Sequence, residues 1–82
     1  MLEDLRQRRK TVGLKQTMKA VEANQAQVVY LAEDADERLV AAVLAACHNK
    51  NIPVHSAESM KLLGKACGID VGTAVAAVTI DE

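Results

Sequence analysis

The residues best suited to bind a ligand lie between Gly13 and Lys19, where two lysines and an amide follow a glycine at the start of a predicted helix. Lys15 and Lys19 are four residues apart and share one helix face, with Gln16 beside them on the first turn. A helix start adds free backbone N–H groups and the positive end of the helix dipole. This combination suits a phosphate-rich, hydrogen-bonding partner. The alternative is an ordinary solvated basic face.

Charge is distributed unevenly along a chain whose net charge is only −1. Residues 1–19 carry six of the ten basic residues and two acids, whereas residues 20–82 carry four bases and nine acids. A basic end on an otherwise acidic chain is typical of contact with nucleic acid or another polyanion. An ordinary charged first helix is the alternative explanation. The basic residues concerned are Arg6, Arg8, Arg9, Lys10, Lys15 and Lys19.

Motifs for catalysis, cofactor binding or metal binding are missing from the sequence. The segment Gly64-Lys65-Ala66 lacks the upstream glycine and the hydroxyl residue of a Walker loop, and the glycine spacing does not fit a dinucleotide-binding motif. Cys47 and His48 are adjacent and would point about 100° apart on a helix, which disfavours a zinc site. No nucleophile is paired with a base. We therefore expect a non-enzymatic protein without cofactor or metal.

Apolar patterns along the chain predict an α/β protein of one domain, residues 1–82. The predicted strands cover 11–12, 28–32, 52–55 and 74–80, and the predicted helices cover 2–10, 13 to about 24, about 37 to 49, and 56–67. Asp34 with Glu37 fits an acidic capping box, Ser56 is the expected cap of the last helix, and Gly68 ends it. Proline at position 53 favours either a sheet edge or the entry to a strand. The order of elements predicts a three-layer α/β/α sandwich.

Apolar periodicity also predicts which side chains face the core. They are Leu2, Leu5, Leu14, Met18, Val21, Leu39, Val40, Val43, Leu44, Cys47, Met60, Leu63 and Cys67. Tyr30, the single aromatic residue, lies in a continuous apolar strand and is expected in the core. Binding of RNA through an aromatic stacking platform is therefore excluded, and a helix start, backbone amides and aliphatic loop contacts must serve instead.

Cellular location is predicted from the termini and the cysteines. No apolar run approaches the roughly 20 residues that a membrane helix needs. The N-terminus is charged from Glu3 onward and does not resemble a signal peptide. Cys47 and Cys67 lie in apolar helical patterns and are expected as reduced core thiols, with a disulfide between them as the alternative. We expect a monomeric, cytoplasmic protein with no membrane partner.

Four sequence blocks occur in order along nearly the whole chain. They are Gly13-Leu14-Lys15-Gln16-Thr17-x-Lys19-Ala20, Ala32-Glu33-Asp34-Ala35-Asp36, Asn51-Ile52-Pro53-Val54 and Leu63-Gly64-Lys65-Ala66-Cys67-Gly68-Ile69. Together, at these separations, they resemble the kink-turn-binding ribosomal protein L7Ae family, and in particular its small bacterial members of the YbxF type. The resemblance implies an α/β/α sandwich around a four-stranded mixed sheet. It also implies binding of kink-turns, which are sharply bent RNA elements with tandem sheared G·A pairs.

The family's recognition helix usually begins Gly-x-Asn-Glu-x-x-Lys, and this chain matches it in part. Gly13 and Lys19 match, whereas Lys15 stands in place of asparagine and Gln16 in place of glutamate. A kink opens the normally deep, narrow major groove of RNA and exposes guanine O6 and N7, which lysine contacts well. Glutamine both donates and accepts hydrogen bonds, although it lacks the charge-assisted strength of a carboxylate. The resemblance thus implies that these four residues contact RNA.

Two further segments carry residues that the resemblance assigns to an extruded nucleotide. The first is the loop Ile69, Asp70 and Val71, whose aliphatic side chains pack on that nucleotide in relatives. Asp36 and Val40 align with positions that line the extruded base in some relatives. The alternatives are that Ile69 and Val71 pack in the core, that Asp36 only caps its helix, and that Val40 is entirely core.

The sequence therefore predicts a non-catalytic RNA-binding protein, associated with the ribosome or acting on structured RNAs that contain kink-turns. The alternative is a protein–protein interaction module with no RNA role, because the same fold also serves in stress-response proteins that bind protein partners. A basic helix start beside an apolar loop favours RNA, since a pure protein binder would not need it.

Overall fold

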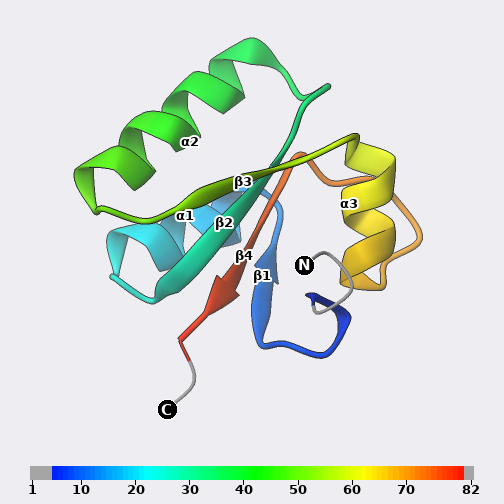
Figure 1. The fold of residues 1–82 in the computed structure, drawn as a ribbon, viewed down its shortest axis with the longest axis horizontal. Coiled ribbons are helices and arrows are strands. Elements are labelled where there is room, and N and C mark those ends of the chain that lie inside the picture. Colours follow the sequence, from blue (N-terminus) through cyan, green and yellow to red (C-terminus); the bar gives the residue numbers. More distant parts are fainter. Residues whose placement is uncertain (1–4, 81–82) are drawn as a thin grey trace.

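The computed structural model describes residues 5–80, which form four strands and three helices in the order β-α-β-α-β-α-β (Figure 1). The elements are β1 (Lys10–Val12), α1 (Leu14–Glu22), β2 (Ala26–Ala32), α2 (Glu37–Asn49), β3 (Val54–Ala57), α3 (Met60–Cys67) and β4 (Val75–Thr79). Among the described residues, no helix is long and apolar enough to cross a membrane.

The strands form one mixed sheet in the spatial order β1-β4-β2-β3. β4 pairs antiparallel with both of its neighbours, with Val12 of β1 opposite Ala76 and Leu31 of β2 opposite Val75. β2 and β3 are parallel and are joined by α2, as a parallel pair requires. The predicted edge position next to Pro53 is confirmed, although β3 begins two residues later than the predicted strand at 52–55.

The sheet is covered on both faces, which confirms the three-layer α/β/α sandwich (Figure 1). Side chains alternate along β2, so that Val29 and Leu31 face the layer of α1 and α2, whereas Tyr30 and Ala32 face α3. Leu5 joins the cluster under α3. Tyr30 is buried as predicted, so the aromatic ring fills the core.

The N-terminal segment is not the helix predicted over 2–10. Leu5 and Arg6 form a short 3₁₀ turn, in which the Arg8 N–H donates to the Leu5 carbonyl at 3.4 Å. The chain then extends, because the Thr79 N–H donates to the Arg9 carbonyl at 3.0 Å and the next residue pairs with β4. Pairing with the sheet edge thus prevails over helix formation. The inward position of Leu5 is confirmed, whereas Leu2 lies outside the described residues.

Two predicted helix caps are wrong. The N-cap of α2 is Asp36, not Asp34, and its Oδ1 accepts from the Arg38 N–H at 2.8 Å. The N-cap of α3 is Ser59, because Ser56 belongs to β3; the Ser59 Oγ accepts from the Leu62 N–H at 3.1 Å. α2 begins where predicted, at Glu37, with Asp36 directly before it, whereas α3 begins later than predicted because β3 extends to Ala57.

Two predicted core residues are exposed instead. Leu14 is 41% exposed because it opens α1 just beyond the ends of β1 and β4, and Thr17 takes the buried position one turn later. The Thr17 hydroxyl lies 2.9 Å from the Thr11 hydroxyl, so its burial leaves no unpaired polar group. Leu44 is 45% exposed because the adjacent Val43 is the residue that points into the core.

Candidate functional site

The starts of all three helices lie at the same end of the sheet, next to the start of β4 (the upper end of β4 in Figure 1). Three backbone hydrogen bonds hold these connections together. The Gly13 N–H donates to the Val75 carbonyl, the Ala32 N–H to the Ala74 carbonyl, and the Glu33 N–H to the Ala57 carbonyl, each at 2.9 Å. A helix N-terminus carries partial positive charge, so the start of α1, which no side chain caps, favours an anionic partner, whereas carboxylates cap the starts of α2 and α3.

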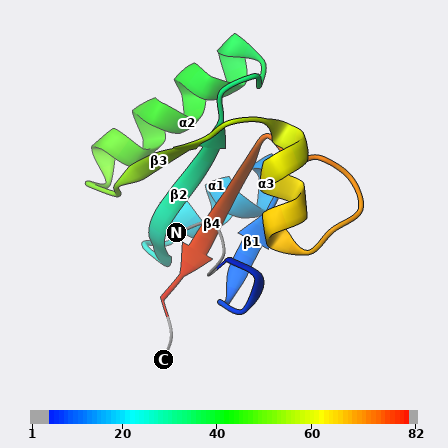
Figure 2. The same ribbon diagram turned by 45° about the vertical axis from the view of Figure 1, so that its right-hand side comes forward.

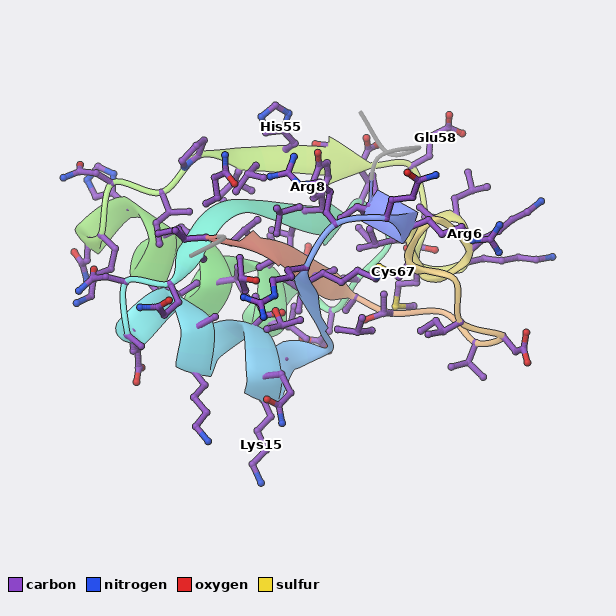
Figure 3. The ribbon with its side chains drawn as sticks, turned by 90° about the horizontal axis from the view of Figure 1, so that it is seen from below. Arg6, Arg8, Lys15, His55, Glu58 and Cys67 are labelled. Carbon is purple, nitrogen blue, oxygen red and sulfur yellow. The ribbon has the colours of Figure 1, made fainter. Side chains whose placement is uncertain are left out.

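The start of α1 is open to a ligand. Gly13 is the N-cap, and its φ of +91° belongs to the region that glycine adopts readily. Because glycine offers no side-chain acceptor, the N–H groups of the first turn are left for an external acceptor. Lys15 and Gln16 are exposed on that turn, and Lys15 points away from the body of the protein (Figure 3). Lys19 is exposed one turn further along.

The loop between α3 and β4 presents Val71 at the surface. Val71 is 70% exposed and Asp70 is also exposed, so the alternative that Val71 packs in the core is wrong. Ile69 is half-buried against the cluster under α3. The loop is fixed at its C-terminal end by Thr73, whose N–H donates to the Met60 carbonyl at 3.0 Å and whose hydroxyl donates to the Val75 carbonyl at 2.9 Å.

The connection between β2 and α2 brings Asp36 and Val40 to the same end of the sheet. Asp36 is exposed and caps its helix, so one of its carboxylate oxygens is engaged by backbone N–H groups. Val40 is half-buried and therefore not entirely core. It borders an open hollow of about 330 Å³ between α2 and β3. The hollow is lined by Leu31, Ala32, Glu33, Val40, Leu44, Val54 and Ser56.

Asp34 makes a long-range contact that local sequence patterns miss. Its Oδ1 accepts from the Met60 N–H at 2.8 Å, so it caps the start of α3 although it lies 26 residues earlier in the chain. This hydrogen bond joins the β2–α2 connection, which contains Asp36, to α3, which precedes the loop of Val71. A capping pattern predicts partners two or three residues away, so the sequence carries no signal for this partner.

The structure separates the N-terminal arginines from the lysines of α1. Arg6 and Arg8 lie on the opposite side of the sheet from Lys15 (Figure 3). Arg8 donates to the Gln27 side-chain oxygen at 2.9 Å, and Lys10 donates to the Arg6 carbonyl at 3.3 Å. The predicted site residues thus gather at one end of the sheet, whereas these basic residues belong to the layer of α3.

The cysteines and histidines do not form a second site within residues 5–80. Cys47 and Cys67 are both buried and unbonded, which agrees with the prediction of core thiols. Burial raises the pKa of both thiols, and the charge of Lys10 opposes that rise at Cys67. No group of three His, Cys, Asp or Glu side chains in this range is placed to hold a metal ion. The His55 ring lies 5.7 Å from the ring of Tyr30.

Comparison with known proteins covers nearly the whole chain. Residues 2–82 match the model of the ribosomal protein L7Ae/L30e/S12e/Gadd45 family. An RNA-binding protein of Caldanaerobacter subterraneus is 46% identical over 74 residues, covering 90% of each chain. The RNA-binding protein YbxF of Geobacillus stearothermophilus is 46% identical over 67 residues, covering 82% of each chain.

Solved structures give the same relationship at the level of the fold. A 15.5 kD RNA-binding protein of Giardia lamblia superposes with a TM-score of 0.88 and 29% identity, over 99% of this chain and 72% of that one. A Bacillus halodurans protein of unknown function superposes with a TM-score of 0.87 and 30% identity, over 96% of this chain and 83% of that one. The chain therefore belongs to the ribosomal protein L7Ae/L30e/S12e/Gadd45 family.

Proposed function

We propose that this protein is a non-catalytic, single-domain RNA-binding protein that recognises kink-turns with the end of the sheet where its three helices begin. One observation carries the proposal: the exposed, uncapped start of α1, with Lys15 and Gln16, shares that end of the sheet with the exposed aliphatic loop of Val71. The bacterial relatives are named RNA-binding proteins, which supports an RNA partner for this protein.

The start of α1 supplies the contacts to the bent part of the RNA. Where a kink opens the major groove, the lysines of α1 contact guanine O6 and N7 or neighbouring phosphates, and Gln16 bonds a guanine edge. The free N–H groups after Gly13 donate hydrogen bonds to a phosphate or base oxygen. These contacts are polar and directional, so they select the sheared G·A pairs over Watson–Crick pairs.

The loop and the start of α2 supply the contacts to an extruded nucleotide. Val71 offers an exposed aliphatic surface, and Asp36 and Val40 lie at the start of the neighbouring helix. With its single aromatic side chain buried, the protein contacts the base through aliphatic groups. A loop whose ends are bonded loses little conformational entropy on binding, which favours affinity.

Calorimetric titration tests the proposal with three RNAs of equal length. They are a standard kink-turn, the same RNA with its sheared G·A pairs changed to Watson–Crick pairs, and a straight duplex. We expect tight binding of the kink-turn and weak, similar binding of the other two. Equal binding of all three would contradict the proposal and would favour the alternative, a module that binds proteins. Co-sedimentation with ribosomes from a cytoplasmic extract shows whether the RNA target belongs to the ribosome or is a separate structured RNA. Sedimentation of the purified protein shows whether it is a monomer.

A further inference from the structure

The loop of residues 68–74 returns alongside α3 and touches it backbone to backbone (Figure 2). At one end, the Ile69 N–H donates to the Gly64 carbonyl at 3.1 Å. At the other end, the Thr73 N–H donates to the Met60 carbonyl at 3.0 Å. Between these two bonds the carbonyl oxygen of Val71 lies directly on Gly64.

The contact exists only because residue 64 has no side chain. A Cβ atom at Gly64 would overlap the Val71 carbonyl oxygen and would lie 3.0 Å from the Gly72 Cα. Both obstacles are backbone atoms, so no rotation of a side chain can relieve the overlap. Helix propensity alone would favour alanine over glycine at this helical position. The glycine is therefore explained by the approach of the loop and not by the helix.

We propose that Gly64 is a positioning residue for RNA recognition, because the space above it determines where Val71 is presented. The residue whose carbonyl rests on Gly64 is the residue whose side chain is 70% exposed at the candidate site. Any side chain at position 64 pushes the loop away from α3 and moves Val71 out of line with the starts of α1 and α2. This inference rests on the proposed contact between Val71 and an extruded nucleotide.

Gly64→Ala tests the inference, with Leu63→Val as the matched control. Leu63 is the neighbouring residue on α3, and its fully buried side chain packs in the cluster under the helix. The control therefore disturbs the same helix without adding an atom against the loop. Each variant is titrated with a kink-turn RNA and with the same RNA carrying an abasic extruded nucleotide. NMR spectra of the free variants report the Val71 amide and methyl resonances separately from any RNA.

We expect wild type and Leu63→Val to prefer the RNA with the base by about tenfold, the value of burying one valine side chain. We expect Gly64→Ala to lose this preference and to shift the Val71 resonances. The inference would be overturned if Gly64→Ala kept the preference for the RNA with the base, or if it bound both RNAs more weakly by the same factor. Lack of any preference in wild type would overturn the base contact instead, and the NMR shifts would still decide whether Gly64 positions Val71.

If Gly64→Ala does not fold, Gly72→Ala gives the same test with a milder displacement. A Cβ atom at Gly72 would lie 3.1 Å from the Met60 carbonyl carbon, so the loop must move by less. We expect a partial loss of the preference for the base and a smaller shift of the Val71 resonances. Full retention of both in a folded Gly72→Ala protein would overturn the inference.

Discussion

Lys19 is exposed on α1, so its side chain is free to contact a guanine edge. We expect Lys19→Ala to weaken kink-turn binding by about 1–3 kcal/mol, the usual contribution of a good base contact. Lys50→Ala is the matched control, because Lys50 is also exposed but lies at the C-terminal end of α2, away from the site. Calorimetric titration measures both variants. Equal affinities of Lys19→Ala and Lys50→Ala would mean that Lys19 belongs to an ordinary solvated face.

Gln16 stands in place of the glutamate of the motif that the sequence resembles, and it is exposed on the first turn of α1. We expect Gln16→Glu to preserve or tighten kink-turn binding, because a carboxylate accepts stronger hydrogen bonds from guanine N1 and N2 than an amide does. A carboxylate also suits the first turn of a helix. Titration against one kink-turn at fixed salt measures the change. A large loss of affinity would show that the amide of Gln16 donates to the RNA.

Val71 is the exposed apolar residue of the loop before β4, so a charge there should affect binding and not folding. We expect Val71→Asp to abolish tight kink-turn binding, because the carboxylate would face the extruded base and nearby phosphates. The melting temperature should remain within a few degrees of wild type, since surface substitutions usually change stability by about 0.5 kcal/mol or less. A large fall in the melting temperature would show that Val71 stabilises the fold, and Val71 would then no longer count as an RNA-contacting residue.

At the scale of elements, the order and type of most helices and strands follow from the sequence. Continuous apolar runs locate β2 and β4, and Gly68 ends α3 in a left-handed conformation with φ of +81° as predicted. Local sequence predicts a helix at the N-terminus, but this segment extends instead because Arg9 bonds to Thr79, which lies near the other end of the chain. The predicted Ser56 cap of α3 failed for a similar reason, since pairing with β2 extends β3 to Ala57. The predicted Asp34 cap of α2 failed because Asp34 accepts instead from the Met60 N–H, 26 residues away.

The long-range contact between Asp34 and the start of α3 gives a stability prediction. We expect Asp34→Ala to lower the free energy of unfolding by about 0.5–2 kcal/mol, because the Met60 N–H loses its acceptor at 2.8 Å. Ser56→Ala should change it by less than about 0.5 kcal/mol, because Ser56 is exposed in β3 and caps nothing. Urea denaturation of both variants compares the two residues. If Ser56→Ala lowered the free energy of unfolding more than Asp34→Ala, Ser56 would be the cap of α3, as the sequence predicted.

At the scale of the molecule, the fold turns a charge gradient along the chain into two distinct basic groups. Lys15 and Lys19 lie on α1, whereas Arg6 and Arg8 lie across the sheet in the layer of α3 (Figure 3). The motif predicts the residues of the candidate site as a set, and the structure brings them to one end of the sheet, where the ends of β1 and β2 lie beside the start of β4. The sequence did not predict that Arg6 and Arg8 lie apart from the lysines of α1, because their position depends on the unexpected course of residues 5–9.

This separation predicts how binding depends on salt. The logarithm of the kink-turn binding constant should fall linearly with the logarithm of salt concentration, because basic side chains displace counterions from phosphates. We expect Lys15→Ala to reduce the slope by about 1 if Lys15 contacts phosphate. Arg8→Ala should leave the slope nearly unchanged, because Arg8 lies across the sheet from Lys15 and donates a hydrogen bond to the side chain of Gln27 on β2. A slope that responds to Arg8 and not to Lys15 would place the RNA on the layer of α3.

The location of the interface is the central claim, and NMR mapping of amide resonances during titration with a kink-turn RNA tests it most directly. We expect the largest changes at residues 13–19, 33–40 and 69–73, which meet at the end of the sheet where the three helices begin. The C-terminal end of α2 and the opposite end of the sheet should change little. Changes concentrated on the C-terminal half of α2 and the outer edge of β3, with residues 13–19 and 69–73 unaffected, would contradict the account.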